Sequence, residues 1–278
     1  MNRLAVITGS NKGIGYELAR SLYLKSASPI NVYMTSRNES LGLQAVHRLS
    51  EERDKVPNPE SKLSYHQLDI TDPKSISVFK DHLKSKHGTS SIDLLVNNAG
   101  IMPKDQDLET AKTTIQTNYF GTVSMTSSLL ELMNVKGRVV FISSTLGKLS
   151  YHSPQIQKRF LAPDLSLSEL DKIELDFIQA ATENVLDKAG FNESPYTTSK
   201  SGVTMYARIL ARDYAADPRK LFFGSCCPGW VKTELGGPKA ILSLQQGVKT
   251  PLYLINGEYD SLYKNNGKFF YQSRVVNY

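Results

Sequence analysis

The sequence has only two cysteines, Cys226 and Cys227, and they are adjacent. Neighbouring cysteines cannot close a stabilising loop, so a disulfide-dependent fold is excluded and free thiols in a reducing compartment are expected. No apolar run approaches the roughly 18 residues of a membrane span. The start of the chain leaves no room for a secretory apolar segment before the run at Leu4. We therefore expect a cytoplasmic protein with no contact with a membrane.

Neither sign of charge is concentrated in one segment. Lysine and arginine number 33 against 27 aspartates and glutamates, a net charge of +6 that would suit an anionic ligand. The basic residues are scattered rather than gathered into a stripe, which argues against a nucleic-acid partner. The 40% of hydrophobic residues is enough for a sizeable core, and no internal repeat is present. A length of 278 residues by itself leaves one or two domains open.

Apolar runs of strand length alternate with segments of helical period. This alternation is typical of βαβ units and predicts a parallel sheet of about seven strands flanked by helices. The expected strands are residues 4–8, 31–35, 63–68, 92–97, 139–143, 221–225 and 268–271, and the expected helices between the first five are 13–25, 41–53, 73–86 and 108–133.

One connection, residues 147–195, is much longer than the others. Within it Ser168 and Asp171 resemble a capping box, which predicts a helix from about residue 168 to 186 with one buried face. The insert can be a surface elaboration packed on the main core, or an arm that shields an active site or blocks an oligomer interface. The apolar residues that recur at spacings of three and four are Leu167, Leu170, Ile173, Phe177, Ala181 and Val185.

The first strand runs into a glycine-rich turn at the start of the first helix, with Gly9, Gly13 and Gly15 at spacings of four and two. Glycine is needed where the backbone turns tightly and where a pyrophosphate approaches the N–H groups at a helix N-terminus. The pattern differs from the commonest dinucleotide fingerprint, but its place between a strand and an amphipathic helix favours a dinucleotide site.

The end of the second strand indicates which dinucleotide is bound. An acidic residue there would bind the ribose of NAD, but this chain has Arg37, which would pair with the 2′-phosphate of NADP. Lys12 in the glycine turn is expected to approach the same phosphate. Either cation alone is more typical of a solvated surface, so the inference depends on both. Asp69 would meet the adenine, and residues 97–100 end the fourth strand at the sheet edge where ligands bind.

Tyr196 and Lys200 lie four residues apart at the start of a predicted helix, so both project from one face. A tyrosine is a poor acid at neutral pH unless a nearby cation stabilises its phenolate, and the lysine supplies that charge. Tyrosine and lysine are common enough in this chain for one such pair to arise by chance. The other motifs therefore decide its meaning.

Taken in order along nearly the whole chain, these motifs resemble the short-chain dehydrogenase/reductase family. They are the glycine turn, residues 97–100, Asn118, the Ser143-Ser144 strand end, the Tyr196 and Lys200 pair, and residues 228–233. The turn sequence, the long insert and residues 226–231 are most similar to the monomeric NADPH-dependent carbonyl reductases. The resemblance implies one doubly wound, seven-stranded Rossmann-type domain over residues 1–278.

The resemblance also implies roles for individual residues. Tyr196 is the proton donor, Ser144 orients the substrate carbonyl, Lys200 activates the phenol and contacts the ribose, and Asn118 holds an ordered water in a proton relay. Ser143 is the alternative to Ser144. Substrate contacts are expected from Ser144, Leu146, Tyr196, Trp230 and Leu235, and no metal is expected. NADPH contacts are expected from Gly9, Asn11, Lys12, Gly13, Ile14, Gly15, Arg37, Asp69, Ile70, Asn98, Ala99, Gly100, Tyr196, Lys200, Pro228, Val231 and Thr233.

The expected activity is NADPH-dependent reduction of small carbonyl compounds such as quinones, aromatic ketones and aldehydes, or dicarbonyls. An NADP-linked alcohol or steroid dehydrogenase is a second hypothesis, and a regulatory protein that binds NADP(H) without turnover is a third. Trp230 is interpreted as a pocket wall, with a core residue as the alternative. A monomer is expected, with Leu170, Ile173 and Phe177 of the insert covering helices at 111–133 and 197–214. Each cysteine can be a reactive or an inert buried thiol.

Overall fold

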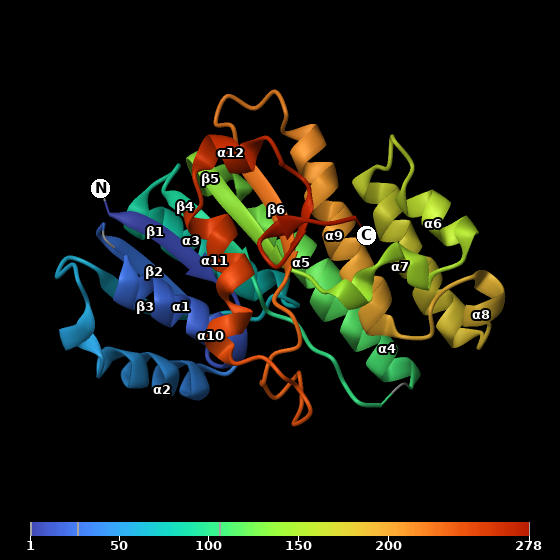
Figure 1. The fold of residues 1–278 in the computed structure, drawn as a ribbon, viewed down its shortest axis with the longest axis horizontal. Helices are drawn as coiled ribbons and strands as arrows, with labels where there is room; N and C mark the ends of the chain where they lie inside the picture. Colours follow the sequence, from blue (N-terminus) through green and yellow to red (C-terminus); the bar gives the residue numbers. More distant parts are fainter. Residues whose placement is uncertain (1, 27, 106, 278) are drawn as a thin grey trace.

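The structure is a computed structural model that describes residues 2–26, 28–105 and 107–277. An eight-stranded sheet lies between two layers of helices (Figure 1). Its order is β3-β2-β1-β4-β5-β6-β7-β8, and every neighbouring pair is parallel except β7 and β8. The strands are β1 (Arg3–Ile7), β2 (Ile30–Ser36), β3 (Lys62–Gln67), β4 (Ile92–Asn97), β5 (Met133–Ile142), β6 (Phe222–Cys227), β7 (Phe269–Tyr271) and β8 (Arg274–Val275).

The doubly wound α/β fold is confirmed, but the expected count of seven parallel strands is wrong by one. The additional strand, β8, is short and antiparallel, and it follows β7 through a two-residue turn. Gln272 and Ser273 in that turn have φ of 51° and 59°. Hairpin turns of this kind are usually marked by glycine or asparagine, which are absent here, so the sequence carries no signal for the hairpin.

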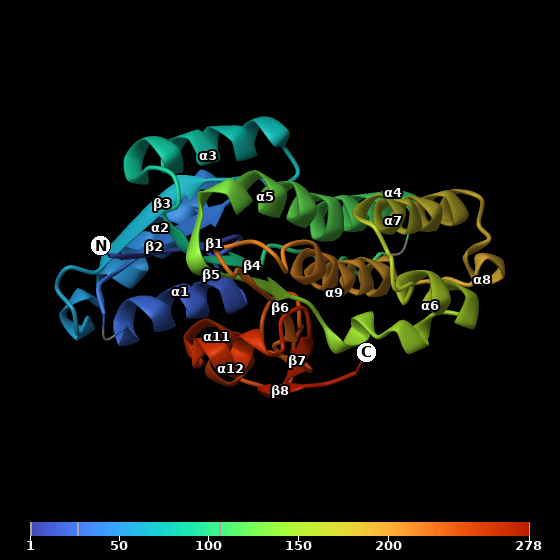
Figure 2. The same cartoon turned by 90° about the horizontal axis from the view of Figure 1, so that it is seen from above.

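Each face of the sheet is covered by helices that bury a separate apolar cluster. Figure 2 shows α3 (Pro73–His87) and α5 (Gly121–Leu129) above the sheet and α1 (Gly13–Lys25), α11 (Lys249–Asn256) and α12 (Tyr259–Tyr263) below it. Alternate strand residues point to opposite faces of the sheet. Val6 therefore joins the apolar cluster between the sheet and helices α3 and α5, whereas Ala5 and Ile7 join the cluster between the sheet and α1. The remaining helices of the main fold are α2 (Glu39–Ser50), α4 (Leu108–Ile115), α9 (Pro195–Asp213) and α10 (Leu244–Gly247).

The single helix expected over residues 108–133 is interrupted. A π-helical turn, η2 (Gln116–Phe120), separates α4 from α5, and β5 already begins at Met133. A π-turn inserts an extra residue into the helical repeat and so rotates the side chains that follow. This turn places Asn118 fully in the interior.

The insert forms three helices, α6 (Pro154–Phe160), α7 (Leu167–Thr182) and α8 (Leu186–Ala189), which lie beside α9 on the right of Figure 1. Leu170, Ile173 and Phe177 are fully buried, and α7 packs against α4 and α9. The expected cap at Ser168 is wrong, because Ser166 Oγ accepts the Glu169 N–H at 3.1 Å. The helix also ends before residue 186, since Asn184 adopts a left-handed φ of 55°.

Candidate active site

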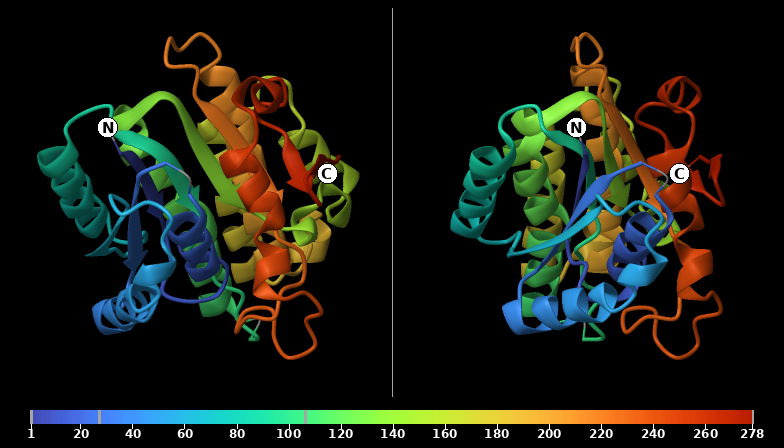
Figure 3. Two further views of the ribbon diagram at one scale, coloured as in Figure 1. Left: turned by 60° about the vertical axis from the view of Figure 1, so that its left-hand side comes forward. Right: turned by 90° about the vertical axis from the view of Figure 1, so that its left-hand side faces the viewer.

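A cavity of about 830 Å³ lies at the carboxyl ends of the central strands. It is lined by the loops that follow β1, β2, β3, β4, β5 and β6 and by the first turns of α9. Figure 3 shows the loop after β6, in orange, projecting at the lower right of both views. All of the site residues expected from the sequence line this cavity except Gly15 and Asn118, which lie just behind its wall.

The glycine turn packs tightly against the end of β4. Gly9 has a φ of 61°, and a side chain there would place its Cβ 2.9 Å from Ala99 Cα. A Cβ on Gly15 would lie 2.4 Å from Asn98 Nδ2, the atom that donates to the Thr8 and Gly9 carbonyls. Gly15 therefore packs against Asn98 with no room for a side chain.

The first turn of α1 has the chemistry of an anion site. No side chain caps its N-terminus at Lys12, and no acidic residue lies in the turn. The free N–H groups and the positive end of the helix dipole favour a bound phosphate. The residues present therefore fit the pyrophosphate of a dinucleotide.

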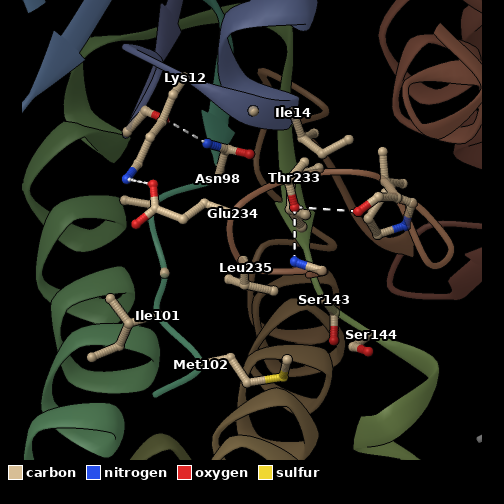
Figure 4. Close-up of a pocket in the computed structure, with 18 of the residues that line it drawn as sticks. Lys12, Ile14, Asn98, Ile101, Met102, Ser143, Ser144, Thr233, Glu234 and Leu235 are labelled. Carbon is tan, nitrogen blue, oxygen red and sulfur yellow. Dashed lines mark hydrogen bonds and ion pairs between the residues drawn. The ribbon is translucent and has the colours of Figure 1, made fainter. Parts of the chain in front are cut away.

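Two cations from the loops after β1 and β2 line the cavity, but only one of them forms an ion pair within the described residues. Arg37 is exposed, and no carboxylate in the described part of the chain forms an ion pair with it. The Lys12 ammonium is bound to the carboxylate of Glu234, and Figure 4 shows the two side chains reaching toward each other. Both members are exposed, so the pair contributes little stability and Lys12 can exchange partners. Asp69 accepts the Thr71 N–H at 2.9 Å and the Thr71 hydroxyl at 2.7 Å, which fixes its carboxylate at the cavity wall.

Tyr196 and Lys200 reach the opposite end of the cavity from the first turns of α9. Ser194 caps this helix, and Pro195 occupies its first position. The Lys200 ammonium lies 5.6 Å from the Tyr196 ring centroid and donates to the Ile142 carbonyl at 2.9 Å. Both side chains are almost completely buried.

Burial changes the proton affinities of this pair in opposite directions. Burial raises the pKa of the Tyr196 phenol, and a hydrogen bond with Ser144 partly opposes the rise. Burial lowers the pKa of Lys200 to about 8, although the thiols of Cys227 and Cys226 oppose this change. At neutral pH the phenol therefore retains its proton, and Lys200 is largely charged.

The two serines at the end of β5 have different environments. Ser143 is buried, and its hydroxyl bonds to the Lys200 carbonyl at 3.0 Å and to Thr204 Oγ1 at 2.7 Å. Ser144 is only partly buried, and its hydroxyl contacts Tyr196 and accepts the Leu146 N–H at 3.1 Å. Ser144 is thus the serine whose hydroxyl is available beside the phenol.

Asn118 lies behind these residues rather than on the cavity surface. Its side chain accepts the Ile101 N–H at 2.8 Å and donates to the Ile101 carbonyl at 2.9 Å and to Ser199 Oγ at 3.1 Å. A Cβ on Gly100 would lie 3.1 Å from Asn118 Oδ1 and 3.4 Å from Lys200 Nζ. Asn118 Oδ1 and Lys200 Nζ therefore both lie close to Gly100.

The chain resembles known enzymes over most of its length. The model of the family described as short chain dehydrogenase matches residues 3–155. The chain is 39% identical over 259 residues to "Carbonyl reductase [NADPH] 1" of Rattus norvegicus, covering 90% of each chain. It is 36% identical over 283 residues to the protein of that name from Bos taurus, covering 99% of this chain and 98% of the relative. The solved structure of salutaridine reductase from Papaver somniferum is similar, with a TM-score of 0.85, 27% identity and coverage of 98% of this chain and 100% of that one.

The chain belongs to the short-chain dehydrogenase family. In this short-chain dehydrogenase the cavity beside Tyr196 has apolar walls. Leu146, Trp230 and Leu235 line it with 47%, 51% and 41% of their surfaces exposed. The alternative interpretation of Trp230 as a core residue is therefore wrong. The indole N–H of Trp230 donates to the Gly236 carbonyl at 2.8 Å.

Sequence reasoning missed several cavity residues of this short-chain dehydrogenase. Ile101 and Met102, labelled in Figure 4, extend the apolar wall, and Thr71 lies near Asp69. Two apolar residues directly after the 97–100 strand end could have indicated this wall.

Cys227 lines the cavity, whereas Cys226 is in the core, where burial raises the pKa of its thiol. Among the described residues no group of three His, Cys, Asp or Glu side chains could hold a metal ion, and no helix is long and apolar enough to cross a membrane.

Proposed function

We propose that this short-chain dehydrogenase reduces small carbonyl compounds with NADPH. One observation supports this most strongly: a single cavity joins an uncapped helix N-terminus at one end to the Ser144, Tyr196 and Lys200 side chains at the other. The relatives named carbonyl reductase [NADPH] 1 support the same cofactor and reaction. The N–H groups at the start of α1 would hold the pyrophosphate, and Arg37 would hold the 2′-phosphate.

The side chains supply the proton chemistry of the reduction. NADPH, when bound, supplies a hydride to the carbonyl carbon. Ser144 donates a hydrogen bond to the carbonyl oxygen, and Tyr196 gives that oxygen its phenolic proton as negative charge develops there. The charge of Lys200 stabilises the resulting phenolate. Asn118 would hold an ordered water through which Lys200 returns a proton, since Asn118 Oδ1 and Lys200 Nζ both lie close to Gly100.

Nicotinamide absorbance with a panel of carbonyl compounds tests this function. Loss of NADPH in the presence of quinones, aromatic ketones or dicarbonyls is the expected result. Faster formation of NADPH from alcohols and NADP⁺ would instead support the dehydrogenase hypothesis. Tight NADPH binding with no turnover of any compound would support the regulatory hypothesis.

We expect Trp230→Ala to raise KM for aromatic dicarbonyls several-fold more than for short aliphatic aldehydes. The half-exposed indole stands in the cavity wall, and stacking on a planar substrate contributes about 0.5 to 1.5 kcal/mol beyond its buried area. Steady-state kinetics with both substrate classes measures the difference. Leu235→Ala is the matched control, since it removes an exposed apolar wall without a ring and should affect both classes alike. Equal losses for Trp230→Ala in the two classes would rule out stacking.

We further propose that the protein is a cytoplasmic monomer. Both cysteines are free, which supports a reducing compartment. The fully buried apolar face of α7 packs on α4 and α9, so this part of their surface is not open to a second chain. Sedimentation should give one chain of 31.0 kDa. A mass of about 62 kDa would show that another surface makes a dimer.

A further inference from the structure

Two acidic residues of the insert face the interior, one turn apart on α7. Glu174 is fully buried, and neither of its carboxylate oxygens has a hydrogen-bond partner among the described residues. Burial and the nearby Asp171 charge raise the pKa of Glu174 well above its usual value, which favours its neutral form. Asp171 is partly buried and does have a partner, because it accepts the Tyr119 hydroxyl at 2.7 Å. The proposed reaction uses neither acid.

Tyr119 connects the insert to the site. It is fully buried in the π-helical turn η2 and directly follows Asn118 in the chain. A Cβ on Gly202 would lie 2.7 Å from the Tyr119 ring and 2.2 Å from Glu174 Oε1. The tyrosine and the neutral acid therefore occupy the space that this glycine leaves on α9, two residues beyond Lys200.

The π-turn depends on side-chain contacts for its position. Its extra residue breaks the regular hydrogen-bond repeat between α4 and α5. On one side Asn118 donates to Ser199, whose hydroxyl donates to the Tyr196 carbonyl at 2.8 Å. On the other side the hydroxyl of Tyr119 is held by Asp171. The turn is thus held between the catalytic helix and the insert.

We propose that Asp171 is a positioning residue: through the Tyr119 hydroxyl it fixes the π-turn and with it the placement of Asn118 against Ser199. Asp171 touches neither the cavity nor the reacting atoms. The inference rests on the proposed function, because it assigns Asn118 a part in proton return. It gives the insert a role in turnover in addition to covering α4 and α9.

Asp171→Leu and Tyr119→Phe test the proposal. Each should lower kcat about tenfold, because the alignment of Asn118 in the site is lost. KM for NADPH and for the carbonyl should stay within about twofold, because binding is retained. The double variant should lose no more than either single one, because both remove the same hydrogen bond. Asp171→Asn keeps an acceptor oxygen for Tyr119 and should restore most of kcat.

Asp176→Leu is the matched control. Asp176 is an acid on the same helix, but its carboxylate pairs with Arg159 at 2.8 Å instead of with Tyr119. Its replacement should leave kcat within about twofold. Amide hydrogen exchange over residues 114–121 gives a readout that is independent of turnover, and exchange should accelerate in Asp171→Leu and Tyr119→Phe only.

Unchanged kcat in Asp171→Leu, an equal loss in Asp176→Leu, or additive losses in the double variant would each overturn the positioning role. If Asp171→Leu does not fold, Tyr119→Phe still tests the hydrogen bond between Tyr119 and Asp171, because it keeps the ring that fills the space against Gly202. Absence of carbonyl reduction by the unaltered protein would instead contradict the proposed function. Hydrogen exchange would still distinguish Asp171→Leu from Asp176→Leu in that case.

Discussion

Replacing Tyr196 with phenylalanine should lower kcat by about 10²- to 10⁴-fold, because only the transferred proton is removed. The ring stays in its buried position at the start of α9, so NADPH binding should stay within a few-fold. Steady-state turnover of the best carbonyl substrate, together with NADPH titration by fluorescence, separates the two effects. Lys200→Ala should weaken both turnover and cofactor binding.

Tyr206→Phe is the matched control for this experiment. Tyr206 is also a buried tyrosine of α9, but its hydroxyl bonds to Ser127 at 3.1 Å and it lies outside the cavity. Its loss should cost stability of roughly 1 kcal/mol with little change in kcat. Substantial carbonyl reduction by the Tyr196→Phe protein would show that another group donates the proton.

The unaltered protein should prefer NADPH over NADH by at least about tenfold in kcat/KM, and Arg37→Asp should abolish or reverse that preference. A charge-assisted contact with the 2′-phosphate contributes about 1.5 to 3 kcal/mol. Arg37 is exposed, lines the cavity and has no carboxylate partner among the described residues, whereas Lys12 must first leave Glu234. Arg37 should therefore account for more of the preference than Lys12. Kinetics of each variant with both cofactors measures this directly.

Arg48→Asp controls for the change in net charge. Arg48 belongs to α2, close to Arg37 in the chain, but it packs over the Tyr16 ring and does not line the cavity. This variant should keep the preference for NADPH. Equal use of NADPH and NADH by the unaltered protein would refute the role assigned to Arg37.

Most of the fold follows from local patterns in the sequence. The strand at residues 92–97 is found as expected, because strands buried on both faces of a parallel sheet are rich in apolar residues. The helix at 13–25 is also found as expected, because its apolar residues recur with the period of a helix. The π-turn at Gln116–Phe120 was not predicted, because it shifts the apolar pattern at a single point and contains no glycine or proline to mark that point. The true cap at Ser166 was missed because Ser168 offers the same residue type two positions later.

The candidate site was predictable where a motif is contiguous and was missed where contacts join distant segments. The glycine turn, and likewise the spacing of Tyr196 and Lys200, can be recognised within a few consecutive residues. The Lys12 pair with Glu234 joins residues 222 positions apart, and the Tyr119 bond to Asp171 spans 52 positions. Such contacts depend on the packing of whole elements, so no local pattern indicates them.

The strand order also determines when a growing chain can first hold a substrate. The amide of Ser143, at the end of β5, bonds to the Cys226 carbonyl of β6, and the loop after β6 supplies the Trp230 wall. In a nascent chain that already contains Tyr196 but not β6, the edge of β5 that pairs with β6 is therefore unpaired. The cavity also stays open on that side until residues 222–236 leave the ribosome. Parallel pairings between distant segments form slowly, because loop closure must precede them. The half-made protein should consequently need protection from aggregation and should consume no cofactor.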